Sequence, residues 1–299
     1  MIQFEINITD TCPAKCHDCI MSEYKSPDSS IIELLNKTKE ITNMLVWATG
    51  GEPLLRPDLV ESILKTGVDV QIVTTGVFNE DKLVNLMKSY SNARRVNVSI
   101  LGDPEFERGF KKIEGDFERK WLWSLNRNKV NIIFVVYRNE LKDSKVFDNL
   151  RYVFENYGYF NICLLYDRCD RFTKEELIEI GLFVKNLSVR HGVEVMVFPE
   201  RLVWPTIFVS GKELKYYFGR CLSSIPIKTV LEDTEGFIDT VVSGYTLNKL
   251  DSLRNCSVYS QYKGCGGPGC RYGYIKECED FWSQFIIPSK LVKGGVLWQ

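Results

Sequence analysis

Residues 2–19 read IQFEINITDTCPAKCHDC, an alternating apolar run followed by three closely spaced cysteines. Apolar side chains at every second position of Ile2–Ile8 predict a buried β-strand. Cys12, Cys16 and Cys19 then form a C-x3-C-x2-C triplet on the loop that leaves this strand. Three thiolates on one short loop can hold three irons of a [4Fe–4S] cube, which leaves the fourth iron open for reaction. The stretch therefore predicts a reactive iron–sulfur site at a strand end.

Two other uses of these thiols explain the spacing less well. Zinc prefers four ligands, often supplied as two separated pairs. A disulfide scaffold would need pairing partners and a small secreted chain. The chain has ten cysteines among 299 residues, which predicts a reducing cytoplasm where the thiols bind metals.

A glycine pair follows the second apolar run, at residues 44–48. Thr49-Gly50-Gly51-Glu52-Pro53 comes directly after this run, and adjacent glycines let a backbone approach a ligand closely. A cysteine triplet after the first strand and Gly-Gly-Glu-Pro after the second together resemble the radical SAM superfamily.

In that family the open iron chelates the amino and carboxylate groups of S-adenosylmethionine (SAM). The reduced cluster cleaves SAM to a 5′-deoxyadenosyl radical, with electrons from an external donor such as flavodoxin or ferredoxin. The resemblance assigns the [4Fe–4S] cluster to Cys12, Cys16 and Cys19. It assigns the methionine amino group of SAM to Gly50, Gly51 and Glu52.

Two further positions extend the resemblance. Residues 70–76 predict a third strand that ends in a small polar turn, and residues 96–100 predict a fourth. In the peptide-modifying branch of the family, a serine near the fourth strand contacts the methionine or ribose of SAM. Ser99 matches this serine, and Thr75 matches a third-strand position near the substrate. Serine and threonine also satisfy ordinary turns at strand ends, so that alternative stays open.

Strand and helix patterns alternate through the N-terminal two thirds of the chain. This alternation predicts a parallel sheet that right-handed crossovers curl into a partial (β/α)6 TIM-like barrel over residues 1–198. Both motifs then lie at the carboxyl ends of strands, where barrel enzymes place their active sites. The expected strands cover residues 2–8, 44–48, 70–75, 95–101, 131–137, 159–165 and 193–198. The expected helices cover Ile31–Thr42, Pro57–Lys65, Asp81–Ser89, Phe117–Asn126 and Thr173–His191.

A second domain is expected over residues 199–299, where this alternation stops and half of the cysteines occur. Thr229–Val242 reads as a hairpin, and residues 265–270 form a glycine-rich loop with a thiol at each end. Small residues let a backbone wrap a cluster and direct amides at its sulfides. The segment resembles the SPASM or twitch extensions of radical SAM enzymes, which carry auxiliary [4Fe–4S] clusters.

The resemblance to a SPASM extension is imperfect. Val241 occupies the position of an expected cysteine, Cys256 has no close C-x2-C partner, and the last C-x3-C step is stretched. Because five late cysteines cannot ligate two cubes, one auxiliary cluster is expected. Zinc on the same thiols remains the alternative. The favoured ligands are Cys256, Cys265, Cys270 and Cys278, with Cys221 as the substitute. Cys163, inside an apolar run, is expected to be a buried core residue.

Composition narrows the class of protein. Hydrophobic residues make up 44% of the chain, enough for one sizeable core and a smaller unit. No apolar run reaches about eighteen residues, so no membrane partner is expected. The formal charge of −1 gives no electrostatic case for a nucleic-acid partner.

Three functions are compatible with these patterns. The first is a radical SAM enzyme that modifies a peptide or protein side chain, forming a crosslink, a thioether or an oxidised residue. The second is oxidation or rearrangement of a small metabolite, such as an aminosugar or nucleotide. The chain starts directly on its first strand, and the missing leader-binding domain of many peptide maturases weakens the first hypothesis. The third is a non-catalytic iron–sulfur or zinc scaffold, which would have no need for a SAM motif.

Overall fold

The computed structural model describes residues 2–16, 19, 25–27, 29–115, 117–141, 144–166, 173–193, 195–198, 206–218 and 221–253. These residues belong to two compact units. The first unit consists of Met1–Val98, Arg108–Val130 and Trp204–Asn248. The second consists of Ser99–Glu107, Asn131–Val203 and Lys249–Gln299.

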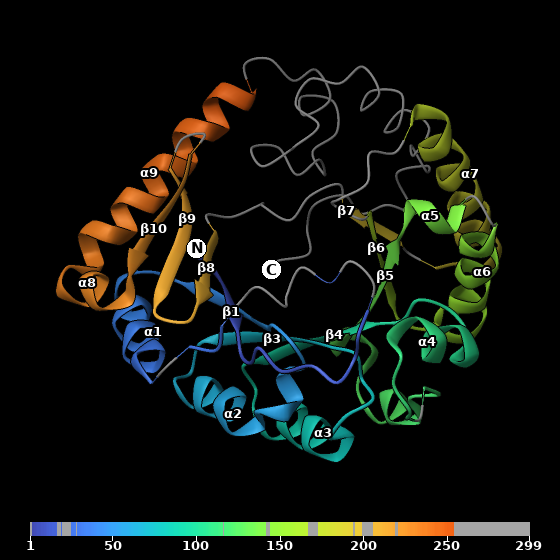
Figure 1. Ribbon diagram of the computed structural model, residues 1–299, viewed down its shortest axis with the longest axis horizontal. Helices are drawn as coiled ribbons and strands as arrows, with labels where there is room; N and C mark the ends of the chain where they lie inside the picture. The colour runs from blue at the N-terminus through green and yellow to red at the C-terminus, as the bar shows by residue number, and fades with distance from the viewer. Residues whose placement is uncertain are drawn as a thin grey trace. The chain divides into compact units, whose positions relative to one another are not determined.

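Parallel strands alternate with helices in the first unit (Figure 1). The strands pair in the order β1, β2, β3, β4, and helices α1, α2 and α3 lie along one side of them. Each helix follows the strand before it, as right-handed crossovers between parallel neighbours require. The elements are β1 (Ile2–Asn7), α1 (Ser30–Ile41), β2 (Met44–Thr49), α2 (Pro57–Lys65), β3 (Asp69–Thr74), α3 (Glu80–Ser89) and β4 (Ala93–Ser99).

β1 is buried on both faces. All six of its residues are buried; the even-numbered ones are apolar, whereas Gln3, Glu5 and Asn7 lie on the opposite face. A buried polar face needs internal hydrogen bonds. One of these joins neighbouring strands, because Asn97 Nδ2 of β4 donates to Gln71 Oε1 of β3 at 3.0 Å. The first strand thus places a polar row inside the unit.

Three more strands extend the first unit beyond β1. β8 (Thr206–Ser210) pairs parallel with β1, and the antiparallel strands β9 (Glu213–Phe218) and β10 (Cys221–Pro226) follow. The chain after the cysteine loop is hydrogen-bonded to the turn between β8 and β9. Lys25 N donates to Ser210 Oγ at 3.1 Å, and Gly211 N donates to Lys25 O at 2.8 Å.

The hairpin prediction for Thr229–Val242 is wrong. The segment forms helices α8 (Ile227–Glu232) and α9 (Thr234–Leu253) instead. Asp233 Oδ1 accepts from Gly236 N at 3.0 Å, so the polar turn is a helix start rather than a hairpin turn. Phe237, Ile238 and Val241 are buried at helical spacing.

In the second unit, three strands pair parallel in the order β5, β6, β7. Helices α6 and α7 pack together, with the Phe147 and Phe183 rings 4.9 Å apart between centroids. Cys163 of β6 is 3% exposed, which confirms its predicted place in the core. The elements are β5 (Val130–Val136), α5 (Arg138–Leu141), α6 (Lys145–Tyr157), β6 (Asn161–Tyr166), α7 (Lys174–His191) and β7 (Val195–Phe198). Helix α4 (Pro104–Lys111) belongs partly to each unit.

The predicted helix at Phe117–Asn126 is a short 3₁₀ turn, η3 (Lys120–Ser124). Arg119 begins it in a left-handed conformation, with φ of 48°, which no helix interior allows. The other predicted strands and helices agree with the structure to within two residues.

The predicted α/β fold is confirmed, with an open sheet in place of a closed barrel. The strand order runs β10-β9-β8-β1-β2-β3-β4 in the first unit and β5-β6-β7 in the second, and neither order is cyclic. Residues 254–299, which carry most of the predicted cysteine-rich extension, lie outside the described residues. Among the described residues, every helix is too short or too polar to cross a membrane.

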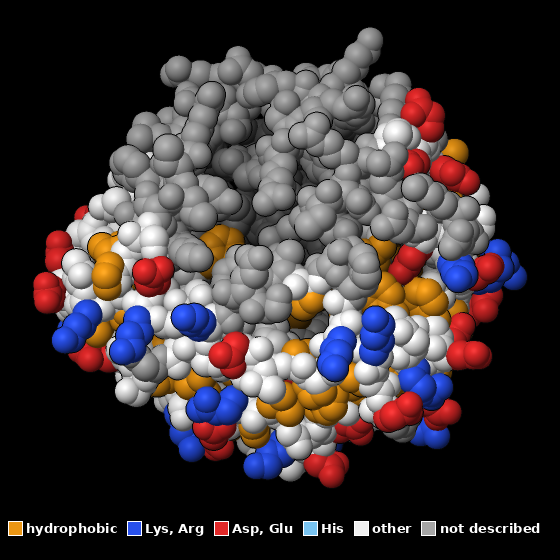
Figure 2. Space-filling view, viewed as in Figure 1, with side chains coloured by type: hydrophobic (Ala, Val, Ile, Leu, Met, Phe, Trp, Pro, Cys, Tyr) orange, Lys and Arg blue, Asp and Glu red, His pale blue; other side chains and the backbone are white. Residues whose placement is uncertain are grey.

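Charges on the surface are mixed in sign. On the face drawn in Figure 2, Lys and Arg side chains of the described residues are interspersed with Asp and Glu. Such pairs include Arg94 with Asp69 and Lys65 with Glu61, at 2.8 and 3.0 Å. Exposed pairs of this kind contribute little to stability.

The second unit also buries a carboxyl group without partners. Both side-chain oxygens of Glu140 in α5 are inaccessible and accept no hydrogen bond from the residues that the structure describes. Burial raises the pKa of Glu140 from 4.5 to about 7, although nearby Lys145 opposes the shift. The unfolded chain therefore loses this proton at lower pH than the folded protein does. The free energy of unfolding falls as pH rises from about 4.5 to about 7.

We predict that Glu140→Gln removes this dependence. At pH 8 the substitution should raise the free energy of unfolding by about 1–2 kcal/mol, a value reduced for partial solvent screening. At pH 4 the gain should vanish, because the native carboxyl is then neutral in both states. Thermal unfolding at the two pH values measures this, with exposed Glu155→Gln as the control. An equal shift at pH 4 and pH 8 would contradict the argument.

Candidate functional site

The three N-terminal cysteines lie on the loop that leaves β1. Cys12 and Cys16 are partly buried, Cys19 is exposed, and none forms a disulfide. Backbone hydrogen bonds fix the loop, since Thr11 N donates to Thr9 Oγ1 and Lys15 N donates to the carbonyl of Lys111. These bonds fix the first part of the loop, up to Lys15.

The thiols share a loop but do not form a closed set of ligands. No group of three or more His, Cys, Asp or Glu side chains among the described residues converges tightly enough to hold a metal ion. The pKa of Cys12 is raised from 9.0 to about 11, mainly by burial, and the Glu52 carboxylate and the other two thiols contribute to the same shift. Three thiols on one loop are nonetheless the donor set that an iron–sulfur cluster requires.

The Gly-Gly-Glu turn is hydrogen-bonded to the chain that enters the cysteine loop. Gly51 N donates to Thr9 O at 2.7 Å, and Glu52 N donates to Thr11 O at 3.0 Å. Thr11 immediately precedes Cys12, so these two hydrogen bonds form a short ladder that joins the turn to the cysteine loop. The position of the first thiol therefore depends on the position of the turn.

Close packing explains both glycines. Gly50 has φ of +117°, and a Cβ there would overlap Asn7 Oδ1. A Cβ on Gly51 would overlap the carbonyl of Thr11. The glycines are thus needed for contact with β1 and the cysteine loop.

Glu52 joins this turn to the third strand. Its carboxylate is fully buried and accepts four hydrogen bonds. The donors are Leu54 N at 3.2 Å, Thr74 Oγ1 at 2.7 Å, Thr75 N at 3.0 Å and Thr75 Oγ1 at 2.7 Å. A carboxylate can accept from all of these groups at once, whereas an amide could not.

The end of β3 is held from the other side by η3. Arg119 Nε donates to Thr75 O at 2.9 Å, and Trp121 Nε1 donates to Gly76 O at 3.1 Å. Arg119 is 1% exposed, with its guanidinium over the Phe117 ring. The amide, hydroxyl and carbonyl of Thr75 thus all have protein partners, and its predicted contact with substrate stays a prediction.

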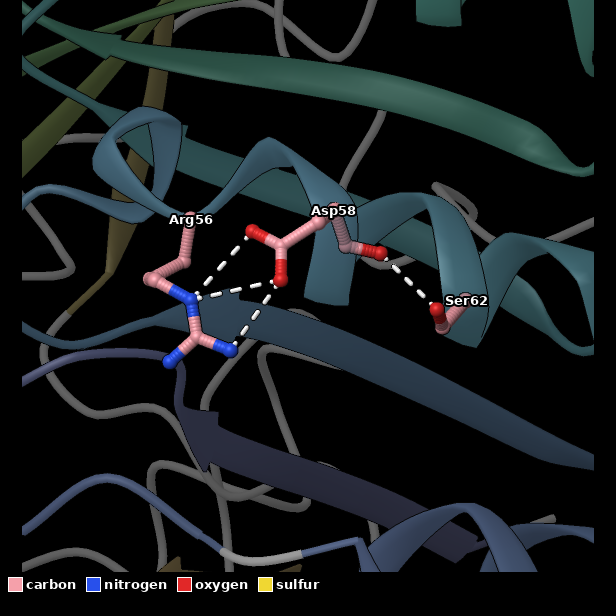
Figure 3. Close-up of polar contacts among 3 residues, drawn as sticks. All are labelled: Arg56, Asp58 and Ser62. Atoms are coloured by element: carbon pink, nitrogen blue, oxygen red, sulfur yellow. Dashed lines mark hydrogen bonds and ion pairs between the residues drawn. The ribbon is translucent and has the colours of Figure 1, made fainter.

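An ion pair lies where the turn leads into α2 (Figure 3). The Arg56 guanidinium donates to both oxygens of Asp58, and Ser62 Oγ donates to the Asp58 carbonyl at 2.8 Å. The pair lowers the pKa of Asp58, with the hydrogen bond from Arg56 as the main cause. These contacts lie at the start of α2, and both side chains of the ion pair are exposed.

Of the remaining predicted ligands, the structure describes Ser99 and the backbone of Cys221. Ser99 ends β4 and is partly buried, and the backbone of Cys221 begins β10. Cys256, Cys265, Cys270 and Cys278 lie outside the described residues. Their assignment to an auxiliary cluster stays a prediction.

The fold is similar to that of solved Streptococcus suis proteins. SuiB bound to S-adenosylmethionine matches with a TM-score of 0.59 and 12% identity, covering 88% of this chain and 70% of that one. SuiB bound to precursor peptide SuiA matches with a TM-score of 0.55 and 11% identity, covering 71% and 58%.

Curated relatives match part of the sequence, although no family model does. GTP 3′,8-cyclase of Clostridium perfringens (strain SM101 / Type A) is 29% identical over 171 residues, half of this chain. GTP 3′,8-cyclase of Actinobacillus pleuropneumoniae serotype 3 (strain JL03) is 27% identical over 127 residues. These similarities support the resemblance of the chain to enzymes of the radical SAM superfamily.

The matched segment spans only part of these relatives. It covers 51% of the Clostridium cyclase, 36% of the Actinobacillus cyclase and 24% of human Molybdenum cofactor biosynthesis protein 1, which is 28% identical over 155 residues. Similarity therefore supports the radical SAM fold and leaves the substrate to be argued separately.

Two residues that hold this candidate site, Arg119 and Asn7, could not be predicted from the sequence. Arg119 was placed in a predicted helix, and nothing in the sequence pairs it with Thr75. Asn7 lies in an alternating strand, where it counted only as the polar half of the pattern. The sequence signal for Asn7 is the set of three polar residues at alternate positions of β1, a strand that is buried on both faces.

We predict that Gly51→Ala displaces the cysteine loop. Since the new methyl group would overlap the Thr11 carbonyl, iron content after anaerobic reconstitution should fall together with SAM affinity. Gly109→Ala is the control, because a Cβ at that position meets nothing within 4 Å. Iron analysis and calorimetry measure the two effects. Normal iron with weakened SAM binding would show that the glycine serves the ligand alone.

Proposed function

We propose that this radical SAM enzyme generates a 5′-deoxyadenosyl radical and uses it to modify a peptide or protein side chain. The observation that carries the proposal is the ladder between the cysteine loop and the Gly-Gly-Glu turn. These hydrogen bonds hold the proposed cluster loop beside the proposed SAM-binding turn. A metal scaffold without catalysis would need only the loop.

The proposal assigns a role to each predicted residue of the cysteine loop and the Gly-Gly-Glu turn. Cys12, Cys16 and Cys19 would hold the [4Fe–4S] cluster, and the carbonyls of Gly50 and Gly51 would face the amino group of SAM. The bound cluster would supply the electron that cleaves SAM. Glu52 is committed to four protein donors, so its role is to hold the turn.

Fold similarity favours a peptide substrate. SuiB has been solved with its precursor peptide SuiA, and this chain shares the SuiB fold. The curated sequence relatives favour the alternative, a nucleotide or another small metabolite, because two of those above are GTP cyclases. The two substrate classes can be separated by the rate of 5′-deoxyadenosine formation. Added peptides should stimulate it if the substrate is a peptide, and added nucleotides should stimulate it if the substrate is a nucleotide.

A second cluster fits the remaining cysteines. The late cysteines are proposed to hold one auxiliary [4Fe–4S] cluster through Cys256, Cys265, Cys270 and Cys278, with Cys221 as an alternative ligand. The cluster would accept an electron from the oxidised substrate or bind the substrate directly. An external flavodoxin or ferredoxin would reduce the SAM-binding cluster.

We predict that replacing Cys12, Cys16 and Cys19 together with alanine abolishes 5′-deoxyadenosine formation. The reconstituted parent should hold about eight irons, and the triple variant about four, because the auxiliary cluster remains. Cys163→Ala is the control, since this thiol is buried in the second unit. Iron analysis and chromatography of the nucleoside measure the outcome. Cleavage of SAM at the parent rate by the triple variant would refute the assignment.

A further inference from the structure

Asn7 is a buried amide that makes no hydrogen bond. It ends β1, is 2% exposed, and neither Oδ1 nor Nδ2 has a partner in the part of the chain that the structure describes. Leaving both ends of a buried carboxamide unsatisfied costs free energy, whichever way the amide is turned. On the same face of the sheet, Gln71 is partly satisfied by Asn97. Asn7 is thus a poor choice for packing alone.

Asn7 lies between the cysteine loop that follows β1 and the Gly-Gly-Glu turn that follows β2. In the parallel register it pairs with Thr49, the residue before the glycine pair. Its Oδ1 lies against Gly50, so closely that a Cβ there would overlap it. Two residues further along, Thr9 O accepts the Gly51 amide at 2.7 Å. A group bound beside the turn would therefore be bound beside Asn7.

The chemistry of a carboxamide narrows the kind of group. Nδ2 donates and Oδ1 accepts, so a ligand with an acceptor and a donor close together would satisfy both. The amino-acid end of SAM carries a carboxylate and an ammonium on one carbon atom. The adenine and sulfonium parts of SAM do not present that pair of charges.

We propose, building on the proposed function, that the Asn7 carboxamide hydrogen-bonds the amino-acid end of SAM. Nδ2 donates to the carboxylate, and Oδ1 accepts from the ammonium group. The unpaired amide destabilises the ligand-free protein and is satisfied when SAM binds. Asn7 is therefore a SAM-binding residue contributed by the first strand, additional to the Gly-Gly-Glu turn.

The test uses Asn7→Leu, an apolar side chain of similar size. SAM affinity is measured by calorimetry on reconstituted protein with the cluster kept oxidised, so that SAM is not cleaved. The dissociation constant should rise at least about tenfold, the effect of roughly one hydrogen bond to a charged group. Iron content should stay at the parent level. The melting temperature of the metal-free protein should stay the same or rise.

Thr38→Val is the matched control. Thr38 Oγ1 in α1 is likewise buried without a partner, and the substitution removes it without changing the shape of the side chain. It should leave SAM affinity unchanged. If Asn7→Leu lowers the iron content, Asn7→Ala, which adds no atoms beyond Cβ, answers the same question.

Two results would overturn the proposal, and they are distinguishable. Parent affinity for SAM in Asn7→Leu or Asn7→Ala, at normal iron content, would show that Asn7 does not contact SAM. A lower melting temperature with unchanged SAM affinity would assign Asn7 to packing. A parent protein that binds no SAM would overturn the proposed function, and this assignment with it.

Discussion

The pair of backbone hydrogen bonds from Gly51 and Glu52 to Thr9 and Thr11 is the constraint on which the site depends. It extends the pairing of β1 and β2 beyond the sheet, so that the cysteine loop and the glycine turn leave the strands together. The two hydrogen-bonded segments lie too close together for a side chain between them, because a Cβ on Gly51 would overlap the carbonyl of Thr11. The glycines are required by this packing, whatever they also offer to a ligand.

The buried Glu52 carboxylate fixes the end of the neighbouring strand β3. The Glu52 carboxylate gathers donors from its own turn and from Thr74 and Thr75, and Arg119 holds Thr75 from the opposite side. Charge-assisted hydrogen bonds of this kind are strong and geometrically demanding. The ends of β2 and β3 are thereby held in one arrangement before ligands arrive, which spares a ligand the entropy of ordering them. The carboxylate holds the turn, and the contacts with SAM are proposed for backbone groups and for Asn7.

Much of this could be predicted from the sequence. Strand and helix periods place seven strands and several helices correctly, because apolar alternation and helical spacing are local signals. The two motifs are contiguous, so their residues can be named without a structure. The hairpin at Thr229–Val242 failed because a polar turn signal at Asp233 also begins a helix. Arg119 and Asn7 escaped notice because their importance comes from contacts across strands, which one sequence does not display.

Electron paramagnetic resonance of the reduced protein tests the central claim most directly. The cluster proposed on Cys12, Cys16 and Cys19 has one open iron, which SAM would ligate. Adding SAM to anaerobically reduced protein should therefore change the low-temperature signal of one [4Fe–4S] cluster. The signal of any auxiliary cluster, whose irons are all held by thiolates, should remain as it was. A spectrum that is the same with and without SAM would contradict the account.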